Sequence, residues 1–349
     1  MSFDKLGLND PILKALKQKG YKAPSPIQTK AIPAILDKRD VMAAAQTGTG
    51  KTASFILPIL NMLSNPKHQF KGNTLRALVV TPTRELAAQV RESAVTYGRN
   101  LNLKSTAIYG GTSVRNQKKV LRRGIDILVA TPGRLLDLYN QKSIDFSKIE
   151  ILVLDEADQM LDMGFINDIK KIIRLLPDRR QNLMFTATFS DPFRALANKF
   201  SYKPIEISVT KDNETAKNIE HYIHPVETSR KSELLVHLIK KEKWKQALVF
   251  TRTKHGANRL AAEIKSSNII SDALHGNKSQ AARQRTLKDF KSGKVNVLVA
   301  TDIAARGIDI EGISHVINYE LPNVPEDYIH SCLLYTSDAA DDTPCVDLG

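Results

Sequence analysis

The chain has 349 residues, of which 42% are hydrophobic and 25% are charged, and its formal net charge is +14. This length and composition predict two folded domains and exclude a disordered or fibrous chain, while the positive charge favours a polyanionic partner. No apolar run approaches the roughly 18 residues of a membrane span and the first residues carry no export signal, so we expect a cytoplasmic protein without membrane contact.

Short apolar runs alternate with helical patterns along the whole chain, which indicates an α/β fold. The runs are 77–81, 126–131, 151–158, 182–188, 247–253, 272–276, 295–301 and 315–320. Because these strands are almost purely apolar, helices should cover both faces of each sheet, and this predicts parallel sheets.

A glycine-rich segment, 42–52, follows a short apolar start at Val41 and precedes a helical pattern. Gly48 and Gly50 would let backbone N–H groups face a phosphate. Lys51 would reach the β- and γ-phosphates, and Thr52 would offer its hydroxyl to Mg²⁺. The strict pattern has glycine where Ala45 stands, so the segment is a variant phosphate loop. A simple turn would not explain the Lys-Thr pair at a helix start.

The run 151–158 ends abruptly in acidic residues, at the strand end where parallel sheets bind their ligands. Asp155 would hold Mg²⁺ through water, and Glu156 would position or deprotonate the attacking water. Helix capping is the alternative explanation. Capping does not require three acids within four residues, so we favour a catalytic site.

Two pairs of segments repeat in the same order: 77–89 with 247–261, and 126–137 with 296–309. Each is an apolar strand, a threonine at its end, and a loop that enters a helix. Although many α/β strands look alike, paired matches in one order favour duplicated domains. The polar stretch 209–220 between them is the predicted linker.

The composition changes after His330. Residues 331–349 contain four aspartates, both cysteines (Cys332 and Cys345), and no lysine or arginine. The cysteine positions exclude a disulfide framework or a zinc site in the rest of the chain. A natural divergent tail would explain the change, but we favour a foreign sequence, produced by a frameshift or by read-through.

With its Asp155-Glu156-Ala157-Asp158 letters and its phosphate loop, the chain resembles the DEAD-box RNA helicases, most closely the bacterial RhlE-like branch, over about residues 1–330. The resemblance implies two tandem RecA-like parallel-sheet domains. They would span 1–208 and 221–330, joined by the linker 209–220 and followed by the anomalous tail 331–349. The second domain would be truncated and lack its last strand, which would leave an exposed sheet edge.

The resemblance also implies an ATP site. The segment 20–28 is similar to the Q motif, in which Gln28 would read the adenine edge, with Phe3 or Tyr21 as the ring partner. Lys51, Asp155 and Glu156 would be catalytic, and Thr52 and Asp155 would hold Mg²⁺. The other nucleotide-binding residues would be Gln46, Thr47, Gly48, Thr49, Gly50, Gly307 and Asp309.

The implied partner is RNA, bound through its backbone with little regard to sequence. The implied RNA-binding residues are Arg84, Gly110, Gly111, Thr131, Pro132, Gly133, Arg134, Gln280, Arg283, Thr301 and Asp302. Asp158, Thr186 and Thr188 would couple the nucleotide and RNA sites. The resemblance implies local separation of short duplexes, while the RNA target and protein partners are left open.

The chain departs from the family pattern after His330, where the family continues with an arginine- and glycine-rich motif. Those arginines would stabilise the transferring phosphoryl group, a contribution of roughly 10³–10⁵ in rate. Three hypotheses follow: an RNA-dependent ATPase and helicase, a binder of ATP and RNA without efficient turnover, and a DNA-directed motor. The Q motif and the DEAD letters argue against the third.

Overall fold

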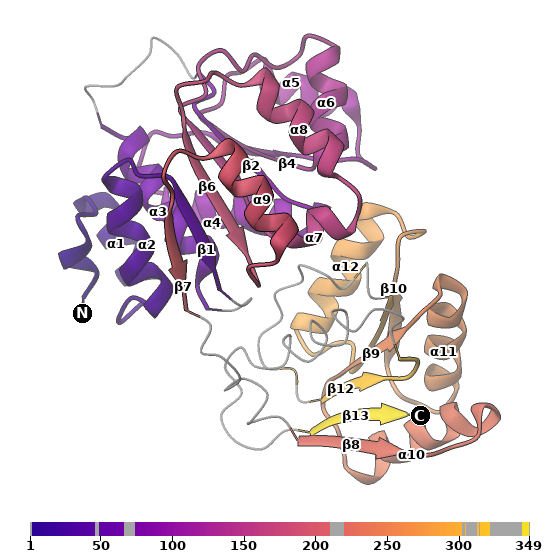
Figure 1. The fold of residues 1–349 in the computed structure, drawn as a ribbon. Coiled ribbons are helices and arrows are strands. Elements are labelled where there is room, and N and C mark those ends of the chain that lie inside the picture. Colours follow the sequence, from indigo (N-terminus) through magenta and orange to yellow (C-terminus); the bar gives the residue numbers. More distant parts are fainter. Residues whose placement is uncertain are drawn as a thin grey trace. The chain divides into compact units, whose positions relative to one another are not determined.

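The computed structural model describes residues 2–45, 49–65, 74–209, 220–301, 304, 313, 315–321 and 344–348. It divides into two compact units, residues 1–210 and 211–349 (Figure 1). This boundary falls inside the predicted linker, whose residues 210–219 lie outside the described part of the chain. None of the described helices is both long and apolar enough to cross a membrane.

The first unit is built on a seven-stranded sheet with the order β3-β4-β2-β5-β6-β1-β7, in which all paired strands are parallel. The strands are β1 (Val41–Ala44), β2 (Ala77–Val80), β3 (Ser105–Ile108), β4 (Ile127–Ala130), β5 (Ile151–Leu154), β6 (Gln181–Thr186) and β7 (Ile205–Ser208). The helices are α1 (Asp10–Gln18), α2 (Pro26–Leu36), α3 (Lys51–Leu63), α4 (Arg84–Tyr97), α5 (Val114–Leu121), α6 (Pro132–Asn140), α7 (Ala157–Asp162), α8 (Ile166–Leu175) and α9 (Asp191–Phe200), preceded by the 3₁₀ helix η1 (Phe3–Leu6).

Both faces of this sheet are buried, as the apolar runs predict. Alternate residues of one strand enter different cores: Ala77 and Val79 of β2 pack with α1–α4, while Leu78 and Val80 pack with α6–α9. Because both faces of each strand are buried, the strands are almost purely apolar, and polar residues are found at the strand ends.

The second unit is a six-stranded parallel sheet with the order β10-β11-β9-β12-β13-β8. Its strands are β8 (Glu220–His224), β9 (Ala247–Thr251), β10 (Ser271–Leu274), β11 (Val297–Thr301), β12 (His315–Asn318) and β13 (Pro344–Leu348). Its helices are α10 (Lys231–Lys241), α11 (Lys254–Ser266) and α12 (Gln280–Lys291), preceded by the 3₁₀ helix η3 (Thr228–Arg230).

The predicted duplication is confirmed by the strand orders. β10-β11-β9-β12-β13-β8 follows the same path as β3-β4-β2-β5-β6-β1. In the first matched pair of segments, the second threonine has the same local role in both units: Thr83 accepts a hydrogen bond from Leu86 N at the start of α4, and Thr253 accepts one from Gly256 N at the start of α11. These are N-caps, which satisfy a helix's free N–H groups.

One expectation about the second sheet is wrong. We expected it to lack its last strand, but β13, which belongs to residues 331–349, pairs with β12 on one side and β8 on the other. It occupies the position that β6 has in the first sheet. Because β12 pairs with β9 on one side and with β13 on the other, it is not an edge strand.

Candidate functional site

The phosphate loop and the acidic motif meet at the carboxyl edge of the first sheet. β1 leads into the loop before α3, β5 ends directly before Asp155, and only β6 separates these two strands. Gly50 is the N-cap of α3 with φ 83°, a left-handed conformation that glycine adopts without strain. Thr49 and Thr52 flank Gly50 and Lys51, while Gln46, Thr47 and Gly48 lie outside the described residues.

Lys51 is buried between two carboxylates. Its Nζ is 3.8 Å from Asp155 Oδ1 and 3.8 Å from Glu156 Oε1. Burial lowers the pKa of Lys51, but Asp155, Glu156 and Asp158 more than compensate, so that its pKa is raised and the ammonium stays charged. Burial raises the pKa of Asp155, and Lys51 only partly offsets that effect.

These charges are poorly satisfied by the protein itself. Within the described part of the chain, neither Lys51 Nζ nor the two carboxylate oxygens of Asp155 have a hydrogen-bond partner. Buried polar atoms without partners cost free energy unless a ligand supplies the bonds. An ammonium and a carboxylate beside a helix N-terminus suit a phosphate chain with its divalent cation, so the donor set fits MgATP.

Glu156 adopts a strained backbone conformation. Its φ of 54° and ψ of 53° place it in the left-handed region, between the end of β5 and the start of α7. Such a conformation costs a non-glycine residue on the order of 1 kcal/mol and is concentrated at functional sites. The kink holds the Glu156 carboxylate, which is 3% exposed, beside Lys51.

Gln28 joins the predicted adenine segment to the phosphate loop. Ser25 N donates to its Oε1 (2.9 Å), and its Nε2 donates to the Gly50 carbonyl (3.1 Å). A side chain at position 50 would collide with this amide, because a Cβ there would lie 2.3 Å from Gln28 Nε2. The Ser25 and Gln28 spacing is a capping box, which marks the start of α2.

Phe3 and Tyr21 form an edge-to-face pair with ring centroids 6.1 Å apart. Phe3 is 6% exposed and packs into the core, whereas Tyr21 is 38% exposed. The Tyr21 hydroxyl is 2.8 Å from the Tyr97 hydroxyl. Phe3 thus packs against Tyr21 from the core, and Tyr21 is the ring of the two that is exposed enough to contact a ligand.

Asp158 connects the acidic motif to the end of β6. Its Oδ2 accepts a hydrogen bond from Ala187 N (2.9 Å), and Thr186 Oγ1 donates to the Thr188 carbonyl (2.8 Å). A shift of the acidic motif would therefore move the Thr186–Thr188 segment with it.

The predicted RNA-binding residues of the first unit form a second cluster at the same edge of the sheet. Arg84, the first residue of α4, lies over Gly110 and Gly111, which follow β3. A Cβ at Gly111 would lie 2.1 Å from Arg84 Nη1, and Gly111 has φ 78°. The positive φ favours glycine at this position, and the absence of a side chain leaves room for the Arg84 guanidinium.

The α6 residues complete this cluster. Thr131 is the N-cap of α6, and Pro132 occupies its first turn. Gly133 is exposed, and a Cβ there would meet only open space. Arg134 donates through Nη1 to the Thr112 carbonyl (3.3 Å) and to Gln117 Oε1 (2.9 Å).

Sequence reasoning missed Gln117. Its Nε2 donates to the Tyr109 carbonyl (2.9 Å) and to Thr112 Oγ1 (2.6 Å), while its Oε1 accepts from Arg134. Gln117 therefore ties the loop after β3 to α6. Nothing in the sequence distinguishes it from an ordinary surface glutamine, because its role depends on contacts between distant segments.

In the second unit, Gln280 and Arg283 lie on the first turn of α12, and Thr301 ends β11. All three are buried, with Gln280 4% and Arg283 8% exposed, so the side chains offer little surface of their own. Asp302, Gly307 and Asp309 lie outside the described residues.

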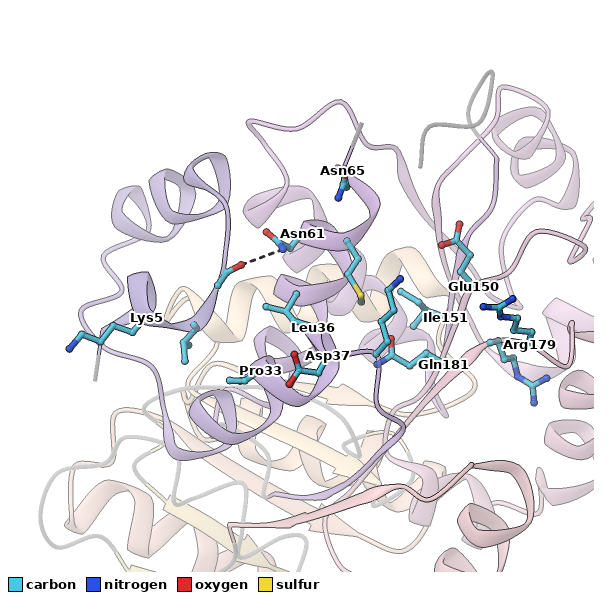
Figure 2. Close-up of a pocket in the computed structure, with 15 residues that line it drawn as sticks. Lys5, Pro33, Leu36, Asp37, Asn61, Asn65, Glu150, Ile151, Arg179 and Gln181 are labelled. Carbon is cyan, nitrogen blue, oxygen red and sulfur yellow. Dashed lines mark hydrogen bonds between the residues drawn. The ribbon is translucent and has the colours of Figure 1, made fainter. Parts of the chain in front are cut away.

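A pocket of about 980 Å³ lies at the opposite edge of the first sheet, where β5 and β6 begin (Figure 2). Its charged lining residues are Lys5, Asp37, Lys38, Glu150, Arg179 and Arg180. Gln181 in its wall donates to the carbonyls of Ile35 and Arg39 and so serves the fold. None of the predicted site residues lines this pocket.

Each of the two units of the chain matches a known protein family. Residues 25–196 match the family model described as DEAD/DEAH box helicase, and residues 230–332 match the helicase conserved C-terminal domain. The DEAD-box ATP-dependent RNA helicase RhpA of Helicobacter pylori is 44% identical over 329 residues, which cover 94% of this chain and 66% of RhpA. The ATP-dependent RNA helicase CshA of Listeria monocytogenes is 40% identical, with 94% and 62% covered. The chain thus spans less than two thirds of the length of these relatives.

Solved structures agree in fold. S. cerevisiae Dbp5 bound to RNA and ADP BeF3 is similar with a TM-score of 0.88 and 32% identity, covering all of this chain and 89% of Dbp5. The structure of a DEAD box protein from the hyperthermophile Methanococcus jannaschii has 37% identity and a TM-score of 0.58, covering all of this chain and 93% of that one.

Proposed function

This chain belongs to the DEAD-box helicase family, and from that premise we propose that it is an ATP-dependent RNA helicase. The observation that carries the proposal is the buried cluster of Lys51, Asp155 and Glu156, in which Lys51 Nζ and the Asp155 carboxylate have no hydrogen-bond partner among the described residues. ATP hydrolysis driven by RNA binding would use that cluster, and the Arg84 and Arg134 cluster would hold the RNA backbone.

Each residue of the nucleotide site would have its own role in ATP hydrolysis. Lys51 neutralises the β- and γ-phosphates, and Glu156 takes a proton from the attacking water. Thr52 and Asp155 would hold Mg²⁺, which would neutralise charge on the phosphate oxygens. The described residues contain no group of three or more His, Cys, Asp or Glu side chains placed to bind a metal ion, so the phosphates themselves would provide several of the ligands.

Recognition of adenine would come from Gln28 and Tyr21. An amide that donates and accepts side by side matches the edge of adenine, and an exposed aromatic ring supplies a stacking face. Phe3 would set the position of Tyr21. Thr47, Thr49 and the loop glycines would add backbone contacts to the phosphates, and Gly307 with Asp309 would contact the ribose.

RNA would be bound through phosphates, without base readout. Arg84, Arg134, the Gly110-Gly111 pair and the N-terminus of α6, where Gly133 is exposed beside Thr131 and Pro132, are suited to phosphate oxygens. Gln280, Arg283, Thr301 and Asp302 would contribute from the second unit. Asp158, Thr186 and Thr188 would transmit the state of the nucleotide, because Asp158 is bonded to that segment.

The second candidate function is nucleotide and RNA binding without efficient turnover. Residues 331–349 contain no lysine or arginine, whereas the family carries an arginine-rich motif after the position of His330. We propose that the tail is foreign and replaces that motif, in a protein of the RhlE-like branch that acts in the cytoplasm, where ATP and RNA are available.

Phosphate release from ATP, with and without single-stranded RNA, tests the proposal. The chain as it stands should release little phosphate, whereas a chain in which 331–349 is replaced by the family's arginine-rich continuation and strand should show RNA-stimulated release, faster by roughly 10³–10⁵. In the replaced chain, Glu156→Gln should lower the rate by roughly 10²–10⁴ with ATP binding retained. Lys51→Ala should weaken ATP binding itself.

Three results would contradict parts of this assignment. RNA-stimulated release by the unaltered chain would contradict the second candidate, binding without efficient turnover, and would show that its tail is functional. If Glu156→Gln hydrolysed ATP at a near-normal rate, the assignment of Glu156 as the general base would be wrong. If DNA stimulated phosphate release as strongly as RNA, and DNA duplexes were separated as well as RNA duplexes, a DNA-directed motor would be favoured.

A further inference from the structure

Basic side chains line one face of helix α5 and of the turn at residues 122–123 that follows it. Arg115, Lys118, Lys119, Arg122 and Arg123 lie on the stripe that spacings of three and four residues create on a helix, and we call them the basic face. All except the half-buried Lys118 are exposed. No acidic residue occurs between Ser113 and Ile125.

The opposite stripe of α5 fixes the orientation of this face. Val114 and Leu121 pack against the core that includes α6 and α8. Gln117 lies on the same stripe and bonds to Thr112 and Arg134. The basic face therefore points away from the sheet and into solvent.

The fold gives no reason for so many like charges. Among the residues that the structure describes, no carboxylate lies within ion-pair distance of any member of the basic face. Like charges spaced by four residues on a helix destabilise it by about 0.2–0.5 kcal/mol for each pair. A polyanionic ligand would remove that repulsion.

The basic face continues the cluster formed by Arg84, Gly111 and Arg134. The loop that carries Gly110 and Gly111 runs directly into α5, and Gln117 links the helix to Arg134. With a rise of 1.5 Å per residue, the basic face extends the cationic surface by about 12 Å.

We propose that the basic face of α5 binds the phosphates of single-stranded RNA beyond those that Arg84 and Arg134 contact. The inference rests on the proposed function, because it extends the same RNA path. Cations on flexible side chains contact phosphates without reading bases, so this segment lengthens the bound RNA and adds no sequence preference.

The test compares the full chain with two triple variants by RNA-binding titration at several salt concentrations. Arg115→Gln, Lys119→Gln and Arg122→Gln together alter the basic face. Lys14→Gln, Lys17→Gln and Lys19→Gln are the matched control: these lysines are also exposed, and they lie at α1, which packs on the other face of the sheet (Figure 1). Both variants lower the net charge equally. The probes are labelled oligouridylates of about 8 and about 16 nucleotides.

We expect the α5 variant to bind the longer RNA about tenfold more weakly, from three exposed ion pairs of about 0.5 kcal/mol each. The slope of log K against log salt should become shallower by about 0.7 for each phosphate that the variant no longer neutralises. The shorter RNA and ATP binding should be nearly unaffected, and the α1 control should bind both RNAs like the parent chain.

Equal affinity and equal salt slope in the parent chain and the α5 variant would overturn the inference and would leave an acidic protein as the ligand of this face. The same loss of affinity in both triple variants would also overturn it, because only net charge would matter. Failure of the parent chain to bind either RNA would instead contradict the proposed function. Arg134→Ala separates the two, since it should weaken binding of both RNAs.

Discussion

Among the described residues, Gln28 bonds to Ser25 N and to the Gly50 carbonyl, and these two bonds use one amide N–H and part of the acceptor capacity of its side-chain carbonyl. Two roles therefore compete at one residue. It holds the end of the phosphate loop, and its remaining donor and acceptor can meet a base edge. The first role acts on any nucleotide, whereas the second distinguishes adenine from guanine.

Substitution of Gln28 by alanine separates these roles. If the amide reads adenine, the ATP-induced rise in the unfolding temperature of the first unit should fall much more than the GTP-induced rise, because an unpaired base edge costs about 1–3 kcal/mol. Thermal unfolding with each nucleotide measures this. Gln141→Ala, at an exposed glutamine, is the control. Equal losses with ATP and GTP would assign Gln28 to loop support alone.

The left-handed backbone conformation of Glu156 is one that glutamate disfavours, and the site requires it nevertheless. Glutamate normally avoids the left-handed region, and the local cost is about 1 kcal/mol. The surrounding structure compensates through the burial of β5 and the Asp158 bond to Ala187. The kink brings the carboxylate to Lys51, which an extended continuation of the strand would not do.

At the level of elements, β13 decides how the second sheet is completed. It lies between β12 and β8 with parallel pairing on both sides, so its backbone groups serve two neighbours. Proline is tolerated at the first residue of a strand, where Pro344 stands, but in the interior of a central strand it removes a hydrogen bond from the ladder.

Val346→Pro should therefore destabilise the second unit by about 1–3 kcal/mol, since proline removes a ladder hydrogen bond and leaves its buried acceptor unpaired. The expected result is a lower unfolding midpoint in urea for the second unit and an unchanged one for the first. Val346→Ile, which keeps the N–H group, should leave both midpoints nearly unchanged. An unaltered second transition in the proline variant would show that β13 contributes nothing to the stability of this sheet.

At the scale of the whole molecule, the two units carry different titrating groups. In the second, the His315 ring stacks on Trp244 with centroids 4.2 Å apart. Burial lowers the pKa of His315 from 6.5 to about 4, although Glu242 acts in the opposite direction. Burial also lowers the pKa of His275, with Lys278 and other cations adding to the effect.

Acid should therefore weaken the second unit. Between about pH 6.5 and pH 4 the unfolded chain binds a proton at His315 that the folded chain does not, so the free energy of unfolding decreases as the pH falls. Thermal unfolding across this range should show the second transition moving to lower temperature. His315→Phe, which keeps a ring on Trp244, should reduce the shift. The same shift in parent and variant would mean that other groups, such as His275, account for it.

Much of the architecture was predictable because a buried strand can be recognised from the apolar composition of its own few residues. The eight apolar runs all became strands, since a strand covered on both faces must be almost wholly apolar. β3 and β7, which are partly exposed, have mixed sequences and were not predicted. β13 was missed because the composition of its segment as a whole suggested foreign sequence, whereas pairing depends on which strands it meets.

The sequence by itself determined the α/β class, the duplication, and the residue types of the phosphate and acidic motifs, because periodicity and close spacing along the chain are local properties. Only the tertiary structure decided which of these residues meet. The contact of Lys51 with Asp155, the bond from Gln28 to Gly50, the Gln117 link to Arg134 and the sheet position of β13 all join segments distant in the chain. Such contacts depend on how strands are ordered in the sheet, and that order follows from the packing of the whole unit.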